Sequence, residues 1–325
     1  SLQKVVLLNL KVLARISLHE VEFQRVLNAI VSLFSSDRRL LETRGSLIIR
    51  KLCVLLNAKS IYISLADVLK KTSTSDLEFA SIMVQTLNLI LLTALELSGL
   101  RQVLKNSFQT SASTDDRTVF ASLFHCWSHN PVATLSLCLL AQAYDLASSL
   151  VKKFAEVEIT VGFLMQIDKL VQLLESPIFI QLRLQLLEVD ASYHPALLKS
   201  LYGLLMLLPQ STAFRTLSAR LATVSSLQQH LGRASASPGP GYFQSGEQTT
   251  QENRQIVSKF EDPAAALLRD FEVVQERHAR ARQEALQNRS LHTTKVTSAA
   301  NNSGGLTVVG KSIGGGHEAQ HMTPE

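Results

Sequence analysis

The sequence predicts an all-α protein: an α-solenoid of HEAT- or armadillo-type helical repeats, followed by a flexible linker and one extra C-terminal helix. Through residues 1–231, apolar side chains recur at spacings of three and four, which collects them on one face of a helix. Capping residues stand before prolines where helices are expected to begin. Helix pairs of about 35–45 residues are typical of such repeats, and we expect roughly twelve helices and no strand.

The apolar stripe is clearest between residues 77 and 97, where we expect a helix that is covered on almost every side. Its apolar faces carry Leu77, Ala80, Val84, Leu87, Leu91 and Leu95, widened by Phe79, Met83, Ile90 and Leu97. The expected solvated strip is narrow: Glu78, Ser81, Gln85, Asn88 and Glu96. A helix with so narrow a solvent-exposed strip is expected to lie between neighbouring helices, as in stacked repeats. The segment 159–174 repeats the pattern with Ile159, Phe163, Leu164, Ile167, Leu170, Val171 and Leu174.

Helix starts are expected at Asn130, Ser176 and Asp262, because each of these residues precedes a proline. The side chain can accept a hydrogen bond from the first turn, and proline at the first helical position gives up an N–H that would have no partner there. Ser211 is expected to cap the helix that follows Pro209.

Composition divides the chain into four parts. Residues 1–231 form the expected helical domain, and residues 232–261 are expected to be a disordered linker, because their Ser, Pro, Gly and polar side chains cannot bury enough surface to offset the entropy of ordering. A further helix is expected at 262–289 and a disordered tail rich in Gly, Ser, Asn and Thr at 290–325. Since helical periodicity starts directly after Ser1, we interpret the chain as a fragment of a longer protein.

The composition favours protein partners over a membrane span or nucleic acid. Of the 325 residues, 46% are hydrophobic and 18% are charged. Polar residues interrupt the apolar run at 82–100, and the run at 201–209 is far shorter than the roughly 18 uncharged residues of a span. The net charge of +5 lies within residues 1–231 and is spread without a block. Nucleic-acid binders concentrate their charge, so we expect no nucleic acid, although mild attraction to an anionic membrane surface fits.

The sulfur and imidazole side chains predict neither a disulfide framework nor a metal site. Cys53, Cys126 and Cys138 are few, odd in number and without CxxC spacing, which fits a reducing, cytoplasmic compartment. His125 and His129 flank Cys126 at helical spacing, but zinc needs three or four convergent ligands. We therefore interpret this cluster as packing and capping, and we expect no metal.

One motif suggests a nucleotide, and we reject it. Residues 305–312 match the phosphate-loop pattern GxxxxGK[ST], but such a loop must connect a strand to a helix. The short remainder of the sequence, with Gly314, Gly315 and Gly316, supplies neither. The sequence contains no Gly-rich dinucleotide turn, kinase set or CX5R motif. We expect no cofactor and no catalytic activity; nucleotide binding at 305–312 would revive the alternative of an enzyme.

The expected last helix has a thin apolar stripe formed by Leu267, Phe271, Val274, His278 and Ala281. Thin stripes suit docking into a groove or onto another helix. We expect this helix to dock onto its own solenoid or onto a neighbouring subunit. A plain surface helix is the alternative.

Four runs of sequence resemble a known family. They are Leu40–Cys53 (LLETRGSLIIRKLC), Ser128–Val132 with Leu135–Leu140 and Tyr144, Lys169–Phe179 with Leu182–Leu187, and Leu201–Ser211 (LYGLLMLLPQS). Together they resemble the C-terminal part of the vacuole-morphology scaffold of the complex that makes phosphatidylinositol 3,5-bisphosphate. The similarity extends from about residue 2 to residue 223 and also touches the last helix, whereas the linker and the Gly-rich tail depart from it.

The resemblance implies a non-catalytic HEAT-repeat scaffold. Members of this family bind a PIKfyve-type lipid kinase and a Sac-domain phosphoinositide phosphatase that acts on the same phosphate, and they lie peripherally on endosomal and vacuolar membranes. Their C-terminal region, about 115–231 in this chain, self-associates into a pentamer and carries the phosphatase-binding site. Kinase binding is attributed to N-terminal repeats that this chain lacks.

We place the association surfaces in or beside the segments Phe179–Leu187 and Tyr202–Leu208 and the last helix, although ordinary core burial explains these segments equally well. The candidate interaction residues are Phe179, Leu182, Leu186, Tyr202, Leu205, Leu208, Leu267, Phe271, Val274 and His278. A cargo or transport adaptor of armadillo or HEAT type is the alternative function. Such adaptors usually present ladders of Asn and Trp, which the single Trp127 cannot supply.

Overall fold

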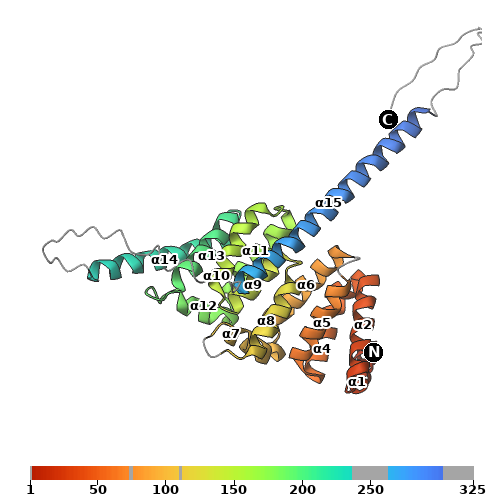
Figure 1. The fold of residues 1–325 in the computed structure, drawn as a ribbon, viewed down its shortest axis with the longest axis horizontal. Coiled ribbons are helices and arrows are strands. Elements are labelled where there is room, and N and C mark those ends of the chain that lie inside the picture. Colours follow the sequence, from red (N-terminus) through yellow and green to blue (C-terminus); the bar gives the residue numbers. More distant parts are fainter. Residues whose placement is uncertain (1, 73–75, 110–111, 236–262, 303–325) are drawn as a thin grey trace, which may run out of the picture. The chain divides into compact units, whose positions relative to one another are not determined.

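The computed structural model describes residues 2–72, 76–109, 112–235 and 263–302, and within these ranges it contains helices and no strand (Figure 1). The prediction of an all-α helical-repeat protein is therefore confirmed. The α-helices are α1 (Leu2–Ile16), α2 (Glu20–Ser36), α3 (Arg38–Leu40), α4 (Ser46–Leu55), α5 (Ala58–Thr72), α6 (Leu77–Thr93), α7 (Ser98–Asn106), α8 (Thr114–Trp127), α9 (Pro131–Leu140), α10 (Tyr144–Lys153), α11 (Val161–Leu174), α12 (Ile180–Gln185), α13 (His194–Leu207), α14 (Thr212–Ser235) and α15 (Pro263–Asn302). A π-helical turn at Leu41–Gly45 precedes α4, and 3-10 turns lie at Leu95–Leu97, Phe154–Glu156 and Pro177–Phe179.

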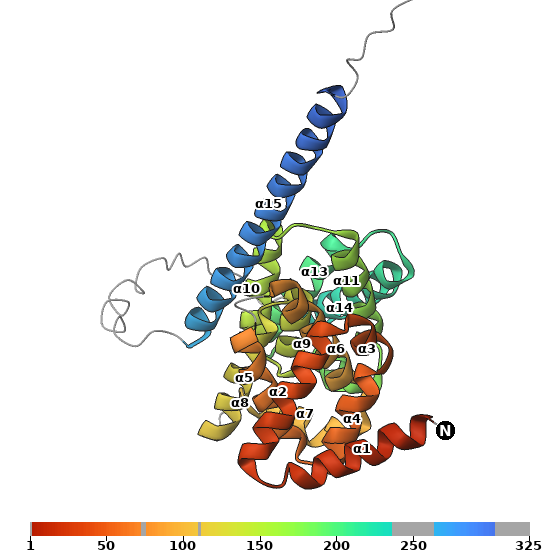
Figure 2. The same ribbon diagram turned by 90° about the vertical axis from the view of Figure 1, so that its right-hand side faces the viewer.

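The helices stack in two layers, as expected for a solenoid. One layer follows the contacts of α1 with α4, α4 with α6, α6 with α9, α9 with α11, and α11 with α14. In the other layer α2 packs on α5 and α5 on α8, which lie side by side in Figure 2, and further along α10 packs on α13. One apolar cluster runs through both layers from Leu10 in α1 to Val224 in α14. Each helix is thus buried by its neighbours in the stack.

The chain divides into two compact units, Ser1–His278 and Ala279–Glu325. The first unit contains α1–α14 together with the opening turns of α15, up to His278. In the second unit α15 continues to Asn302, beyond the end at residue 289 that we expected for this helix. Most of the expected linker, the expected cap Asp262 and the phosphate-loop match at 305–312 lie outside the described residues.

Helix α6 has the buried character that its apolar circumference predicted, with one departure at its end. The fully covered side chains include Phe79, Met83, Val84 and Leu87. The helix stops at Thr93, and Ala94 is extended, so that Leu95 leaves the stripe and is 80% exposed. The expected continuation of the apolar face to Leu95 is therefore wrong, because the backbone turns before that residue is reached.

A buried arginine completes the end of α6. The Arg101 guanidinium donates to the carbonyl oxygen of Leu91 (2.8 Å) in the last turn of α6, where carbonyls lack an intrahelical partner, and to that of Ala94 (2.7 Å) directly after the helix. Burial of Arg101 lowers its pKa from the ordinary value, because the charged form is desolvated. These bonds stabilise the bend between α6 and α7.

Helix caps agree with the sequence at two of the three expected positions that the structure describes. The Asn130 side chain accepts from the N–H of Ala133 (3.0 Å), and Ser211 accepts from the N–H of Phe214 (3.2 Å). Ser176 precedes a 3-10 turn instead of an α-helix, and its buried hydroxyl makes no hydrogen bond among the described residues. The expected cap at Ser176 is therefore wrong, because a 3-10 turn does not present the same first-turn N–H groups.

Trp127 at the end of α8 lies at the centre of the core. Its ring is fully buried and packs 6.2 Å from the ring of Tyr62, centroid to centroid. The indole N–H donates to the Asn88 side-chain oxygen (3.1 Å), which also accepts from the Ser136 hydroxyl (2.8 Å). Asn88 was expected on the solvated strip of α6; it is half-buried and instead joins α6, α8 and α9.

Within the described stretches, no one helix has the length and apolarity that spanning a bilayer requires. Helix α6 and the segment Leu95–Asn106 meet the requirement only as a pair, and the pair is bent by 87°.

Candidate protein-binding surfaces

The first candidate surface is the place, within the first unit, where the start of α15 packs on the other helices. Phe271 is 1% exposed and belongs to the same core as α1–α14, and Leu267 packs against that core at its edge. His278 is buried and Val274 is half-buried. These four residues of the stripe therefore face the helix's own solenoid, one of the two docking partners that the sequence predicted.

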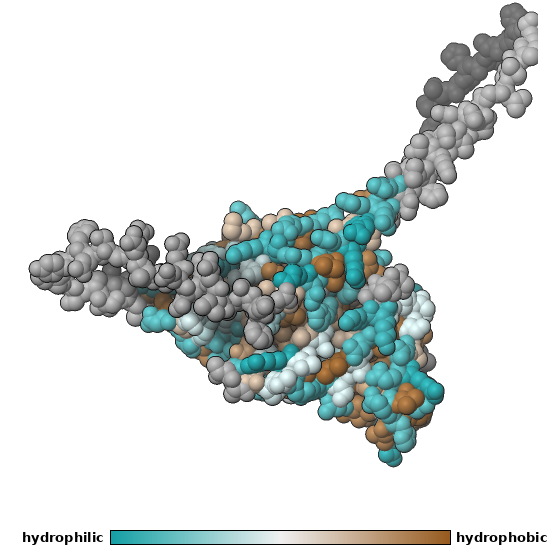
Figure 3. Space-filling view, viewed as in Figure 1, coloured by the Kyte–Doolittle hydropathy of each residue, from teal (hydrophilic) through white to brown (hydrophobic). Residues whose placement is uncertain are grey.

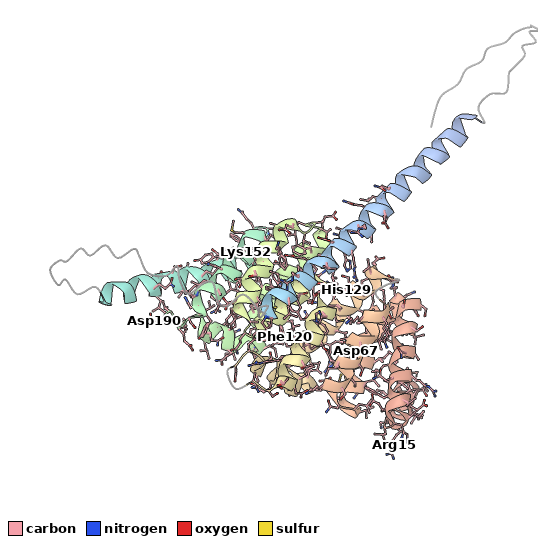
Figure 4. All side chains as sticks on the ribbon, viewed as in Figure 1. Arg15, Asp67, Phe120, His129, Lys152 and Asp190 are labelled. Atoms are coloured by element: carbon pink, nitrogen blue, oxygen red, sulfur yellow. The ribbon has the colours of Figure 1, made fainter. Side chains whose placement is uncertain are left out.

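Polar contacts attach α15 to two helices of the stack. The Gln275 amide donates to the Ser128 carbonyl oxygen (2.6 Å) at the end of α8, and Asp270 lies 3.2 Å from His125 on the same helix. On α10, the Lys153 ammonium lies 2.9 Å from Glu272. The opening turns of α15 thus bridge α8 and α10. His129 lies beside α15 in Figure 4.

Two imidazoles meet at this bridge. His129 Nδ1 and His278 Nε2 are 3.0 Å apart and both rings are buried. One nitrogen must donate and the other accept, so at least one ring is neutral. Burial, together with the nearby Arg277 charge, lowers the pKa of His129 from 6.5 to about 4.

The depressed pKa of His129 predicts that acid weakens the fold. Below about pH 6.5 the His129 side chain becomes protonated in the unfolded chain but stays neutral in the folded chain. The free energy of unfolding is therefore highest above about pH 6.5, and it decreases as the pH falls toward 4. Between pH 7.5 and 5, we expect a loss of about 2 kcal/mol in the free energy of unfolding from this group. Urea unfolding at both pH values measures it, and H129Q should lose less. An equal loss in both proteins would contradict the assignment to His129.

The same histidines do not form a metal site. His125 and His129 each have a partner on α15, and among the described residues no group of three or more His, Cys, Asp or Glu side chains could hold a metal ion. Cys53, Cys126 and Cys138 are free and buried. Burial raises the pKa of the Cys53 and Cys126 thiols to about 12 and raises that of Cys138 as well, which keeps them protonated.

The candidate residues in Phe179–Leu187 lie on the inner face of α12 and of the turns beside it. Phe179, Leu182 and Leu186 are all buried in the core. The outer face carries a second apolar stripe at Ile180, Leu184 and Leu187, which are 50–53% exposed. A partner that reached this segment would therefore contact the outer stripe, which lies beside the predicted residues.

The candidate residues in Tyr202–Leu208 lie on α13 or directly after it. Leu208 is buried, Leu205 is half-buried and Tyr202 is 40% exposed, with its hydroxyl 3.0 Å from the Ser225 hydroxyl on α14. Tyr202 also lines an open groove of about 790 Å³ between α10 and α13, which we call the α10–α13 groove. Its lining consists of Ser148, Val151, Lys152, Ala155, Pro195, Leu198, Lys199, Tyr202, Gly203, Met206 and Leu207.

A third exposed apolar surface lies at the other end of the stack. Val5, Leu8 and Val12 follow helical spacing along α1 and are more than half exposed, and apolar side chains gather at this end in Figure 3. Exposed apolar patches of this kind mark protein contacts.

The sequence did not identify the residues of the helical stack that contact α15, nor the exposed residue at the rim of the groove. His125 and His129 were interpreted as local packing, and Lys153 was not considered, although all three hold α15. Met206, 88% exposed at the rim of the groove, lay in a segment that was interpreted as a uniform apolar run. A signal was present in the spacing of Tyr202 and Met206, which fall one turn apart on the same face of α13.

Comparison with known proteins assigns the chain to a family. The family model described as "Vacuolar protein 14 C-terminal Fig4p binding" matches residues 38–224. The chain is 44% identical over 296 residues to "Protein VAC14 homolog" of Arabidopsis thaliana, covering 89% of this chain and 39% of that protein. The identity is 46% over 219 residues to "Protein VAC14 homolog" of Schizosaccharomyces pombe, covering 67% and 26%.

A third relative, "Vacuole morphology and inheritance protein 14" of Saccharomyces cerevisiae, is 37% identical over 202 residues, which cover 62% of this chain and 22% of that protein. The chain thus spans well under half the length of these relatives. No solved structure matches it. The resemblance read from the sequence is confirmed: the chain belongs to the VAC14 family, and residues 38–224 correspond to the C-terminal region of that family.

Proposed function

We propose that this chain is part of a non-catalytic scaffold that multimerises and holds a phosphatidylinositol 3-phosphate 5-kinase of PIKfyve type together with a Sac-domain 5-phosphatase. The scaffold thereby regulates the level of phosphatidylinositol 3,5-bisphosphate. The match of residues 38–224 to a region described by its binding of Fig4p carries this proposal. The names of the relatives, which refer to the vacuole, support a peripheral location on vacuolar or endosomal membranes.

A scaffold of this kind acts through proximity. Holding two enzymes on one assembly gives each a high effective concentration at the same patch of membrane, without any new bond chemistry. The apolar surfaces on α12 and α13 are of the type that obligate complexes bury. The cysteine thiols are buried and protonated, and His129 is paired with His278, so these side chains are not available as nucleophiles or bases. This supports a binding function over a catalytic one.

The alternative of an armadillo-type cargo adaptor has less support. Such an adaptor needs indole rings exposed along a concave surface, and Trp127 is fully buried. Nucleotide binding by the purified chain, measured by calorimetry, would revive the enzyme alternative at 305–312.

The proposal is tested by pulling down the purified chain with a Sac-domain phosphatase and measuring the mass of the eluted species by light scattering. We expect a multimeric scaffold with the phosphatase bound. Replacing the outer stripe of α12 in the double variant I180D/L184D should lower the mass toward that of a monomer, because buried aspartates oppose an apolar contact. V273D, at an exposed site on α15, is the matched control.

A monomeric wild-type chain that ignores the phosphatase would contradict the proposed function. If the folded I180D/L184D variant still forms a multimer, the outer stripe of α12 is not the multimer interface, but the proposed function stands. Tyr202 and Leu205 are then the next candidates for the interface, and Y202D and L205D test them.

A further inference from the structure

We propose that the α10–α13 groove receives an apolar segment flanked by acidic residues, and that the Sac-domain phosphatase supplies this segment. The inference rests on the proposed function and names the surface and the chemistry through which it operates. Four features of the groove carry it: its apolar lining, its floor, the sign of its charges and its place within the matched region.

The lining is almost entirely apolar. Val151 and Ala155 on the α10 side face Leu198, Met206 and Leu207 on the α13 side, and the hollow of about 790 Å³ has room for several large side chains. Met206 stands 88% exposed at the rim. Methionine adapts its shape to an incoming apolar surface at little cost. A water-filled groove of this composition gains free energy when an apolar segment displaces the water.

The floor is set by a glycine. A Cβ at Gly203 would lie 2.1 Å from Val151 Cγ1, so α10 and α13 approach each other there as closely as backbone and side chain allow. Only glycine permits this approach. The groove is therefore a fixed consequence of how the two helices pack, and a partner meets a preformed surface.

The charges at the rim have one sign. Lys152 and Lys199 line the groove and are exposed, and no acidic residue belongs to the lining. Figure 4 labels Lys152 on α10. Its neighbour Lys153 does not line the groove and is bound by Glu156 and Glu272. A partner that brings carboxylates to the rim and apolar side chains to the floor complements both features.

A second hollow offers a useful contrast. The hollow between α12 and α14, about 320 Å³, also has two cations, Arg183 and Arg220. Arg220 is paired with Glu175, and Arg183 donates to the carbonyl oxygens of Leu174 and Ser176. These guanidinium groups already have partners within the fold, so this hollow lacks the charge complementarity of the α10–α13 groove.

Position within the family match also favours the groove. Every lining residue falls between 148 and 207, inside the matched region 38–224. The exposed stripe on α1 falls outside that region. Among the exposed apolar surfaces described above, the groove therefore combines three properties. It is concave, its only charged lining residues are the cations Lys152 and Lys199, and it lies within the region 38–224 that matches the family model.

The experiment uses biolayer interferometry to compare the affinity of the wild-type full chain for a purified Sac-domain phosphatase with the affinities of variants of the groove. The double variant K152E/K199E reverses the rim charge, and M206D places a carboxylate at the apolar edge. Each should weaken binding about tenfold or more, as is typical when a central contact is lost. K152R/K199R should bind like the wild type. R117E/K169E, which changes two exposed cations on α8 and α11, is the matched control and should also bind like the wild type.

Increasing salt should weaken the wild-type complex more than the K152E/K199E complex, because only the wild type has the attraction to be screened. Circular dichroism and light scattering verify that each variant is folded and assembled. If the wild type binds the phosphatase and the folded groove variants bind equally well, the groove assignment is overturned while the proposed function stands. If the wild type does not bind at all, both are overturned.

One further measurement separates a protein partner from a membrane. Vesicles of phosphatidylcholine with phosphatidylserine are incubated with the wild type and with K152E/K199E. Loss of vesicle binding in the variant with unchanged phosphatase affinity would overturn the inference and assign the lysines to the lipid surface. Unchanged vesicle binding with weakened phosphatase affinity supports it.

Discussion

Replacing Trp127 with alanine is expected to lower the free energy of unfolding by about 3–5 kcal/mol, the usual cost of removing a large buried ring. The indole fills the space where α5, α6, α8 and α9 meet, against Tyr62, and it is fully buried. Its loss leaves a cavity and removes one of the two donors of Asn88. Urea unfolding followed by circular dichroism measures the difference.

Two controls separate the ring from its hydrogen bond. W127F keeps most of the apolar volume and should cost about 1–2 kcal/mol, mainly because the indole N–H is gone. L95A truncates a side chain that is 80% exposed and should change the stability by less than about 0.5 kcal/mol. If W127A were no more costly than L95A, the core position of Trp127 would be wrong.

Replacing Phe271 with alanine is expected to release the opening turns of α15 while leaving the stack folded. Phe271 is the one stripe residue that is fully buried, and its loss should remove about 3–5 kcal/mol of packing. Besides the His129–His278 pair and the edge contact of Leu267, the contacts at Asp270, Glu272 and Gln275 involve exposed or half-buried groups that contribute little alone. Hydrogen exchange of the amides in 263–278 should speed up about a hundredfold or more.

The matched control for this release is V273A, because Val273 lies two residues away and is 47% exposed. Exchange in α15 should be the same in V273A and in the wild type. If the α15 amides of F271A exchanged at the wild-type rate, or if α8 and α10 lost protection to the same extent as α15, the picture of a separately releasable helix would fail.

Helix positions and buried faces could be predicted from the sequence because they follow from local periodicity. The stripe of α6 and the caps at Asn130 and Ser211 depend on residues within a few positions of each other. Asn88 shows where this reasoning stops. It occupies a polar position by periodicity, yet it binds Trp127 and Ser136, which are 39 and 48 residues away.

The candidate surfaces show the same limit more strongly. In α12 the sequence identifies apolar residues on both sides of a short helix, but only the packing of its neighbours decides that Leu182 faces inward and Leu184 outward. The pairing of His129 with His278 joins residues 149 positions apart. Periodicity placed His278 on the apolar stripe of α15, but it contains no information about which residue lies opposite His278 on the neighbouring helix.

The three protonated, buried thiols make this chain a convenient background for site-directed spectroscopy. Maleimide reagents react by the attack of a thiolate on their double bond, and Cys53, Cys126 and Cys138 are buried and protonated at neutral pH. A single cysteine introduced at an exposed position such as Met206 or Val273 would therefore take up a fluorophore or spin label selectively. Distances between labelled sites can then be followed in the assembled complex without first removing any native residue.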